Sequence, residues 1–251
     1  MPRLLALIAI VALVLVALNW VSWALRSSDR DTHPIAESFD RVNVDVDAGS
    51  VRVEASEDGT ASLTATTESA LLADADVSFD VENGELTVEG DCSSGLWLVS
   101  WGRCSIDVVL QVPEEMAVVA KSGAGRVTTA GLVGSADLSS SAGAVRVEGH
   151  TGLLRAHSSA GGVTVTGLSS DDAEITSSAG SVEVTAIDPP ASLRASSSAG
   201  AVTVTLPAGQ SYNVDADSSA GSTTVEVPTD SSSPYRVEAK SSAGTVTVRA
   251  N

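Results

Sequence analysis

The sequence has few aromatic side chains, and this scarcity limits both its core and its chemistry. Only 3% of the 251 residues are aromatic, whereas 43% are hydrophobic, chiefly Val, Ala and Leu. That is enough apolar surface for a folded core, and the residue types favour a thin core of small side chains. A polysaccharide-cleaving site needs carboxylates beside aromatic platforms in a pocket, so the composition argues against such an enzyme.

Basic side chains are also scarce. Lys and Arg total 14 against 32 Asp and Glu, which gives a formal net charge of −18. Binding to nucleic acid or to an anionic lipid surface through electrostatics requires positive charge, so we expect no nucleic-acid partner. The charge predicts a solvated, acidic surface.

Motifs for catalysis or cofactor binding are missing as well. No G-x-S-x-G nucleophile elbow occurs, and the three histidines stand in no pattern that would supply a base. Calcium-binding solenoids need an aspartate in each turn, which "SSAGAV" lacks, and "GAGRVT" lacks the third glycine of a dinucleotide fingerprint. We therefore predict a non-enzymatic protein with no catalytic residue, cofactor or metal ligand. The alternative is a weak cation site among Asp45, Asp47, Asp74, Asp76 and Asp80.

One long uncharged run lies near the N-terminus. The 22 residues from Leu4 to Leu25 carry no charge, and a helix that rises about 1.5 Å per residue crosses a hydrocarbon core of about 30 Å over this length. We predict a transmembrane signal anchor over residues 1–26, because Trp20 and Trp23 stand where an interfacial aromatic belt would lie. A cleaved signal peptide is the alternative, since the sequence Ser-Trp-Ala near the end of the run fits a small-x-small cleavage site.

Only two cysteines are present, Cys92 and Cys104. In an exported chain such a pair forms a disulfide, and two sulfurs without a nearby histidine cannot complete a four-ligand zinc site. A disulfide places the bulk of the chain outside the cell. We therefore predict a single-pass cell-membrane protein with an extracellular C-terminal domain.

The segment between the cysteines carries the densest aromatic patch outside the N-terminal run. Its candidate contact residues are Leu96, Trp97, Leu98 and Trp101. We predict either a cap over the apolar end of a coil or an exposed patch that contacts a membrane or a protein. Solenoid ends need caps, and Trp is favoured at both kinds of interface.

A repeat fills the rest of the chain. Alanine-glycine pairs recur at steps of 18, 18, 19, 20, 21 and 23 residues, with glycines at Gly125, Gly143, Gly161, Gly180, Gly200, Gly221 and Gly244. Such a period indicates a solenoid. Apolar and polar residues alternate on both sides of each glycine, as in "VRVE" from Val145, which is typical of strands. We predict an all-β parallel β-solenoid (β-helix) over residues 39–251 with 18–23 residues per coil, a spacer at 27–38 and a disulfide loop at 92–104.

Each corner of the predicted solenoid repeats the same chemistry. The glycine is expected to permit the turn through a positive φ. A serine two residues before the alanine, as at Ser140 and Ser158, is expected to form a hydroxyl ladder that bonds to turn backbone or to its neighbours. The same template extends to the turns at Gly49 and Gly84. The last strand, "TVTVRAN", is expected to leave an open edge that allows weak end-to-end self-association, which the net charge opposes.

The residues quoted so far carry a resemblance. The reiterated "SSAGxVxV" turns, the segment "CSIDVVLQVPEEMAVVAKSGAGRV" and the N-terminal apolar run followed by "ESFDRVNVDVDAGSVRVEA" resemble the LiaG-like "putative adhesin" domain family over about residues 37–251. The resemblance implies a bacterial surface protein with a β-solenoid ectodomain, and it carries over no catalytic residue. We expect a membrane-anchored adhesin or scaffold that binds wall polymer or a protein partner. The alternative is an accessory protein of an envelope-stress system that acts with a neighbouring membrane regulator, because the stub before the apolar run is too short to signal alone.

Overall fold

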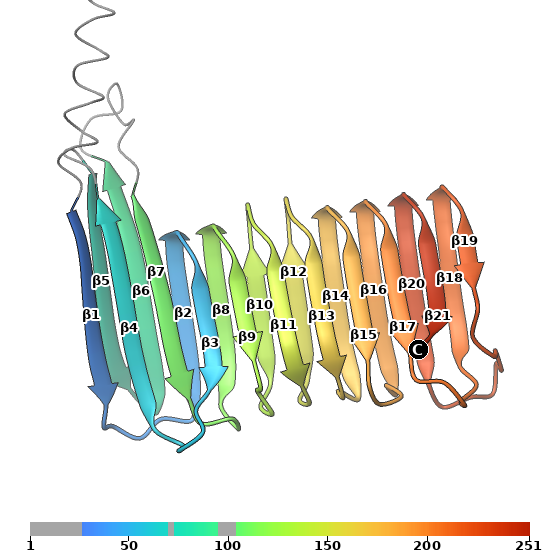
Figure 1. The fold of residues 1–251 in the computed structure, drawn as a ribbon, viewed down its shortest axis with the longest axis horizontal. Helices are drawn as coiled ribbons and strands as arrows, with labels where there is room; N and C mark the ends of the chain where they lie inside the picture. Colours follow the sequence, from blue (N-terminus) through green and yellow to red (C-terminus); the bar gives the residue numbers. More distant parts are fainter. Residues whose placement is uncertain (1–26, 70–72, 95–103) are drawn as a thin grey trace, which may run out of the picture.

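The protein is a stack of β-strands in two facing sheets. The computed structural model describes residues 27–69, 73–94 and 104–251, and Figure 1 shows the strands side by side along one long axis. Within these ranges, no helix is long and apolar enough to cross a membrane. Two predicted features lie outside the described residues: the anchor at 1–26 and the contact residues Leu96, Trp97, Leu98 and Trp101.

Each coil contributes one strand to each sheet. In spatial order, sheet 1 consists of β1 (Ser27–Ile35), β4 (Ala61–Ser69), β7 (Ser105–Val112), β3 (Val51–Ala55), β9 (Val127–Ala130), β11 (Val145–His150), β13 (Val163–Leu168), β15 (Val182–Ala186), β17 (Val202–Leu206), β21 (Val246–Ala250) and β19 (Thr223–Val225). From the same end, sheet 2 consists of β5 (Ala73–Glu82), β6 (Glu85–Ser94), β2 (Arg41–Ala48), β8 (Ala117–Ala124), β10 (Ala136–Ser140), β12 (Leu154–Ser158), β14 (Asp172–Ala179), β16 (Ser192–Ala199), β20 (Arg236–Ala243) and β18 (Asn213–Ala220).

The core consists of stacked columns of small apolar side chains between the two sheets. In sheet 1, Val145 of β11 lies in parallel register between Val127 of β9 and Val163 of β13. These three valines are at most 1% exposed. β-Branched side chains pack well on a pleated surface, and the period of two sends their polar neighbours outward. The predicted all-β fold of stacked parallel coils is confirmed for these strands.

The N-terminal end differs from the predicted repeat. β1 pairs antiparallel with β4, and β4 pairs antiparallel with β7, so residues 27–38, predicted as a spacer, contain a strand of sheet 1. β5 and β6 form an antiparallel hairpin whose turn residues Asn83 and Gly84 have φ angles of 53° and 78°. Asn-Gly is the preferred pair for a two-residue hairpin turn with positive φ at both positions. The predicted place of Gly84 in the solenoid template is therefore wrong.

The coils do not stack in the order of the sequence. The β2/β3 coil lies between β6/β7 and β8/β9, and the β20/β21 coil lies between β16/β17 and β18/β19 (Figure 1). The last strand, β21, therefore pairs with β17 on one side and with β19 on the other. The predicted open edge at the last strand is wrong, because the outermost coil, β18/β19, precedes the final coil in the sequence and the final coil lies inside it. The outermost strands at that end are β18 and β19.

Candidate functional site

One edge of the solenoid is formed by the corners that contain the repeated glycines. A Cβ atom on Gly143 would lie 1.9 Å from the Gly125 carbonyl oxygen, and one on Gly161 would lie 2.2 Å from the Gly143 carbonyl oxygen. Glycine is required because a side chain would collide with the next corner. The expected positive φ is wrong for six of the seven turn glycines from Gly125 to Gly244, all of which are described: of these, Gly244 alone has one, at +157°. The earlier corner at Gly49 also has a positive φ, +130°. The same close approach recurs at Gly180, Gly200 and Gly221.

Inward-facing serines hydrogen-bond each corner to the neighbouring corner. The Ser140 hydroxyl donates to the Gly125 carbonyl oxygen at 2.8 Å, and the Ser158 hydroxyl donates to the Gly143 carbonyl oxygen at 2.7 Å. Equivalent bonds of 2.6 to 2.9 Å are made by Ser122, Ser177, Ser197, Ser218 and Ser241. The predicted hydroxyl ladder is confirmed, and its acceptors are backbone carbonyls, which would otherwise lack a partner in a buried place.

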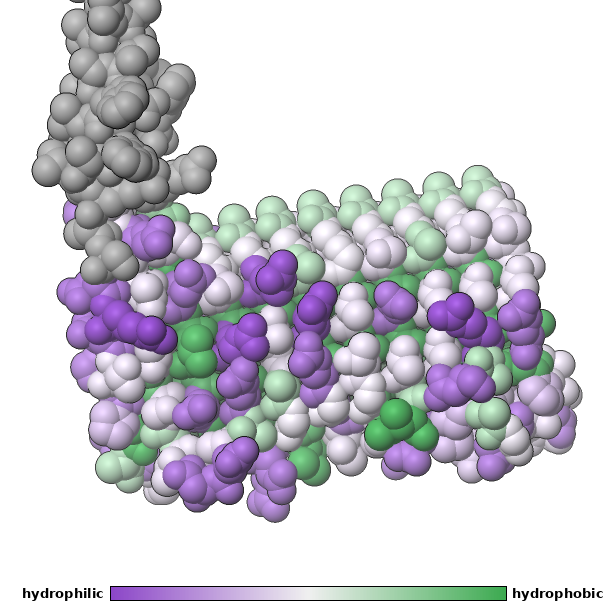
Figure 2. All heavy atoms as spheres, in the orientation of Figure 1, coloured by the Kyte–Doolittle hydropathy of each residue, from purple (hydrophilic) through white to green (hydrophobic). Residues whose placement is uncertain are grey.

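The same edge presents two exposed rows without charge, which we call the corner edge. The first row consists of Ala124, Ala142, Ala160, Ala179, Ala199, Ala243 and Ala220, and it forms the pale green line along the top of Figure 2. The second row consists of Ser141, Ser159, Ser178, Ser198, Ser242 and Ser219. Equivalent residues of neighbouring strands lie about 4.8 Å apart, so both rows are regular arrays.

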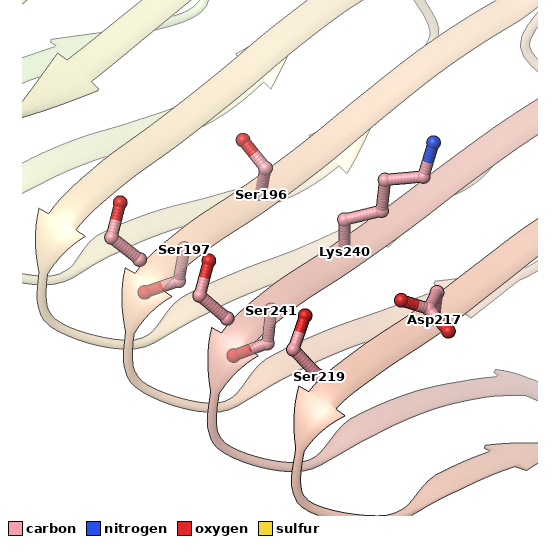
Figure 3. Close-up of a pocket in the computed structure, with 8 residues that line it drawn as sticks. Ser196, Ser197, Asp217, Ser219, Lys240 and Ser241 are labelled. Carbon is pink, nitrogen blue, oxygen red and sulfur yellow. The ribbon is translucent and has the colours of Figure 1, made fainter.

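A groove borders the serine row at the C-terminal end of the molecule. It has a volume of about 260 Å³ and is lined by Ser196, Ser197, Ser198, Asp217, Ser219, Lys240, Ser241 and Ser242. We call it the serine groove, and Figure 3 shows its side chains on three adjacent strands. The hydroxyls of Ser197 and Ser241 are engaged by corner carbonyls. The serines that remain for a ligand are Ser196, Ser198, Ser219 and Ser242.

Two carboxylates hold Lys240 beside the serine groove. Its Nζ lies 2.7 Å from Glu238 Oε1 and 2.9 Å from Asp215 Oδ2. The hydrogen bond to Glu238 and then that to Asp215 raise the pKa of Lys240, while the same bond to Lys240 lowers the pKa of Glu238. These two carboxylates therefore favour the ammonium form of Lys240, which donates hydrogen bonds.

The serine groove offers hydrogen bonds and two charges. A serine hydroxyl both donates and accepts, Lys240 donates and Asp217 accepts, so the lining suits a ligand that is rich in hydroxyl or amide groups. Neither histidine nor cysteine lines it. Across the described part of the chain, no three His, Cys, Asp or Glu side chains form a group that could hold a metal ion.

Sequence reasoning missed the serine groove because its middle strand comes from the inserted coil. Lys240 of β20 lies opposite Ser196 of β16 on one side and opposite Asp217 of β18 on the other. The one available signal was the double serine before each alanine, which we interpreted only as a structural ladder. Nothing in the sequence indicates which coil lies beside which.

The predicted disulfide lies at the opposite end of the molecule. Cys92 and Cys104 are bonded, with their Cα atoms 5.9 Å apart. They join the end of β6 to the start of β7, and the Cys92 backbone N–H donates to Asp47 Oδ2 at the end of β2 at 3.2 Å. The disulfide thus closes a corner on the same edge as the repeated glycines.

Comparisons with known proteins agree with this architecture. Residues 114–251, more than half of the chain, match the profile of the Toastrack DUF4097 family. A solved structure from Bacteroides fragilis, described as a "putative adhesin", has a TM-score of 0.56 at 17% identity and covers 90% of this chain and 97% of its own. That likeness shows a shared fold. No curated protein matches the chain.

Two further solved structures come from Parabacteroides distasonis. One, described as a "putative adhesin", has a TM-score of 0.48 at 13% identity and covers 90% of this chain and 97% of its own. The other, described as a "putative lipid binding protein", has a TM-score of 0.37 at 15% identity and covers 89% of this chain and 97% of its own.

Proposed function

Because the chain belongs to the Toastrack DUF4097 family, we propose that it is a non-enzymatic, adhesin-like surface protein that binds a neutral wall polysaccharide at the serine groove. A membrane anchor at residues 1–26 holds it at the cell surface, with the C-terminal domain outside. Membership of the LiaG-like group is the finer part of this proposal, and the repeated corners and the N-terminal apolar run support it.

The composition of the serine groove is the observation that carries the proposal. Ser198, Ser242 and Ser219 stand in one row on three adjacent strands, at a spacing of about 4.8 Å. Successive hydroxyls of a sugar chain can exchange hydrogen bonds with such a row, and Lys240 and Asp217 add a charged donor and acceptor.

The net charge favours a neutral polymer over an anionic one. At −18 the protein repels polyanions. The corner edge consists of alanine and serine, so the repulsion is weakest along it. A neutral polysaccharide can approach this edge without a charge penalty, and an anionic wall polymer cannot.

The position of the first strand supports presentation of the serine groove away from the anchor. β1 is the outermost strand of sheet 1 at one end, and β18 and β19 are the outermost strands at the other (Figure 1). The chain enters the described part at Ser27, the first residue of β1. A protein anchored through residues 1–26 therefore carries the serine groove at the end of the stack farthest from its attachment.

The proposal is tested by binding of the full-length protein in lipid nanodiscs to two purified wall polymers, one neutral and one anionic. The double variant Ser198→Leu/Ser242→Leu fills the serine groove, and Ser141→Leu/Ser159→Leu places the same side chains on the corner edge away from it. We expect the wild type and the control variant to bind the neutral polymer, and the groove variant to bind at least about tenfold more weakly. An equal loss in both variants, or preference for the anionic polymer, would contradict the proposal.

Cross-linking in intact cells separates this function from the envelope-stress alternative. Recovery of one membrane regulator with the wild type and the groove variant alike, without any polysaccharide binding, would favour the accessory role.

The location of the C-terminal domain has its own test. A protease added outside intact cells should remove an epitope tag placed after Asn251, and protection of the tag would refute an extracellular C-terminal domain.

A further inference from the structure

The outermost coil opposite β1 has a free edge. β18 pairs with β20 on one side, and no described strand pairs with its other side. β19 likewise pairs with β21 alone among the described strands. An edge strand presents unpaired backbone N–H and C=O groups, to which an extended segment of another chain can add.

The segment after β19 covers the start of this edge, where Tyr212 forms an isolated bridge with Thr229, and side-chain exposure shows that the described residues leave the edge uncovered beyond it. Val237 and Ala239 of β20 are 0% exposed, whereas Val214 and Ala216, at the same register positions of β18, are half-buried. Val225 of β19 is 39% exposed. These side chains point toward the core of a coil that has no next neighbour, so an added strand with small apolar residues at alternate positions would bury them.

The charges on the outer face of sheet 2 indicate which strand fits this edge. One outward column reads, in spatial order, Asp137, Arg155, Glu174, Arg194, Glu238 and Asp215. Opposite charges alternate along it as far as β20, with ion pairs of 3.9 Å between Arg155 and Glu174 and 3.5 Å between Arg194 and Glu238. At β18 the alternation ends with a second carboxylate.

The neighbouring outward column also ends in a carboxylate, although there it follows a lysine. Asp217 of β18 lies in register with Lys240 of β20. Both outward positions at the centre of the free edge, Asp215 and Asp217, are therefore carboxylates. Opposite charges on adjacent strands stabilise a sheet and like charges destabilise it, so the next strand should carry cations at these two positions.

We propose that the free edge of β18 binds an extended segment of a partner protein by strand addition. The segment carries Lys or Arg at two alternate positions, opposite Asp215 and Asp217. Its intervening residues are Val or Ala and cover Val214 and Ala216. This binding goes beyond the proposed polysaccharide recognition, because it uses the backbone edge of the outermost coil rather than the serine groove.

A second copy of this chain does not have the required charge. The edge strand at the other end of sheet 2 is β5, which contains Asp74, Asp76 and Asp80. Two β18 edges would likewise bring carboxylates together. Like charges on facing strands oppose such pairs, so the occupant is a different, basic segment.

Two synthetic peptides test the proposal on the full-length protein in detergent micelles. Both derive from the β20 sequence RVEAKSSA and have blocked ends and a fluorophore. In the basic probe lysine replaces the glutamate, and in the acidic probe glutamate replaces the lysine. We expect fluorescence anisotropy to show at least about tenfold tighter binding of the basic probe, with a difference that shrinks as salt is added. Equal binding of both probes, or binding of neither, would overturn the proposal.

Charge-swap variants locate the site. Asp215→Lys/Asp217→Lys should reverse the preference, and the milder Asp215→Thr/Asp217→Thr should abolish it. Asp45→Lys/Asp137→Lys changes the net charge equally on strands inside the sheet and should leave the preference intact. Thermal melting checks that each variant is folded. An unchanged preference in both folded β18 variants would overturn the proposal.

Because Asp217 also lines the serine groove, a further comparison keeps the two sites distinct. Ser198→Leu/Ser242→Leu should lose polysaccharide binding and retain the peptide preference. Asp215→Lys would also remove the ion pair that holds Lys240 in the groove lining, so the serine variant is the one that separates the two sites. If the groove variant also lost the peptide preference, the edge would not be a separate site.

Discussion

At the residue scale, glycine is required in this protein for two different physical reasons. At the corner, a Cβ on Gly143 would lie 1.9 Å from the Gly125 carbonyl oxygen. Near the opposite edge, Gly149 has a φ of +63°, and no atom lies within 4 Å of an added Cβ. The first position excludes a side chain by distance, and the second disfavours one through the left-handed backbone conformation.

This difference predicts unequal effects of the same substitution. Gly143→Ala should lower the free energy of unfolding by more than about 3 kcal/mol, because two corners must separate. Gly149→Ala should cost about 1–2 kcal/mol, the strain of a left-handed non-glycine residue. Urea denaturation of both variants measures the two losses. Equal losses would mean that the corners can relax around a methyl group.

A threonine interrupts one of the buried valine columns. Thr129 lies in register between Val53 and Val147. It is 1% exposed, and its Oγ1 has no hydrogen-bond partner among the described residues. A buried hydroxyl without a partner costs about 1–3 kcal/mol, and valine has nearly the same shape.

Thr129→Val should therefore raise the free energy of unfolding by about 1 kcal/mol or more. Thr129→Ser is the matched control, because it keeps the hydroxyl and loses the methyl group, and it should be less stable than the wild type. Urea denaturation measures both. A destabilised Thr129→Val variant would indicate that a buried water satisfies the hydroxyl.

A buried histidine makes stability depend on pH. His150 is 1% exposed, its Nε2 lies 3.3 Å from the Leu153 carbonyl oxygen, and its Nδ1 has no partner in the described part of the chain. Burial lowers the pKa of His150 from its ordinary value of 6.5, although hydrogen bonds to the backbone of Leu153 and Gly152 oppose this shift. The unfolded chain therefore takes up a proton at a pH where the folded protein does not.

The buried, neutral His150 contributes its full stabilisation above the unfolded-state pKa of about 6.5. This stabilisation is lost as the pH falls from there toward the lower pKa of the folded state. His150→Leu matches the neighbouring Leu168 in its column and should remove this loss between about pH 7 and pH 5. His157→Gln, at an exposed position, should keep the wild-type profile. Thermal melting across this pH range measures all three proteins, and an unchanged pH dependence in His150→Leu would contradict the assignment.

At the element scale, the central feature is the inserted coil. β20 contacts β16 on one side and β18 on the other, so it is an interior strand although it comes last in sheet 2 by sequence. β18 precedes it in the chain and is the outermost strand. This arrangement places the C-terminal segment between two coils, where both of its edges are hydrogen-bonded and fraying of the chain end is opposed.

Because the β20/β21 coil is inserted, an aspartate should destabilise the protein more at Ala239 than at Ala216, although Ala239 lies nearer the C-terminus. Ala239 of β20 is 0% exposed, whereas Ala216 of β18, in register with it, is half-buried. Ala239→Asp buries a charge without a partner and should cost more than about 3 kcal/mol or prevent folding. Ala216→Asp should cost clearly less, because its carboxylate can reach solvent. If Ala216→Asp were the more damaging in urea denaturation, the coils would stack in sequence order.

At the scale of the whole molecule, electrostatic repulsion between like charges opposes compaction. The net charge is −18, and the ion pairs of the described residues lie at the surface, where each contributes little. Such a protein gains stability when salt screens its like charges.

We therefore expect the melting temperature to rise as sodium chloride increases from about 20 mM to about 200 mM, a range over which the screening length falls from roughly 20 Å to below 10 Å. Asp74→Asn/Asp76→Asn on β5 removes two of the charges and should reduce the gain. Differential scanning calorimetry measures both proteins. A melting temperature that falls with salt would show that attractive ion pairs outweigh the repulsion.

The sequence by itself determined the strands of the repeated coils, their inward faces and the corner spacing. Alternation around Val145 and the period of the glycines are local properties, and a period of two allows only one apolar face per strand. The hydroxyl ladder through Ser140 followed from the same repeat. Two cysteines in an exported chain allowed a single intramolecular pair, Cys92 with Cys104.

Only the tertiary structure decided which coil lies beside which, and with it the candidate site. Equivalent corners carry the same Ala-Gly chemistry, so any coil can stack on any other and no local signal orders them. Parallel and antiparallel neighbours also share the same alternation, so the sequence did not indicate that β4 and β5 are antiparallel strands, and β1 lies in the predicted spacer. The serine groove around Lys240 and the free edge at Asp215 arise from this coil order, because contacts between coils depend on neighbours that lie far away in the sequence.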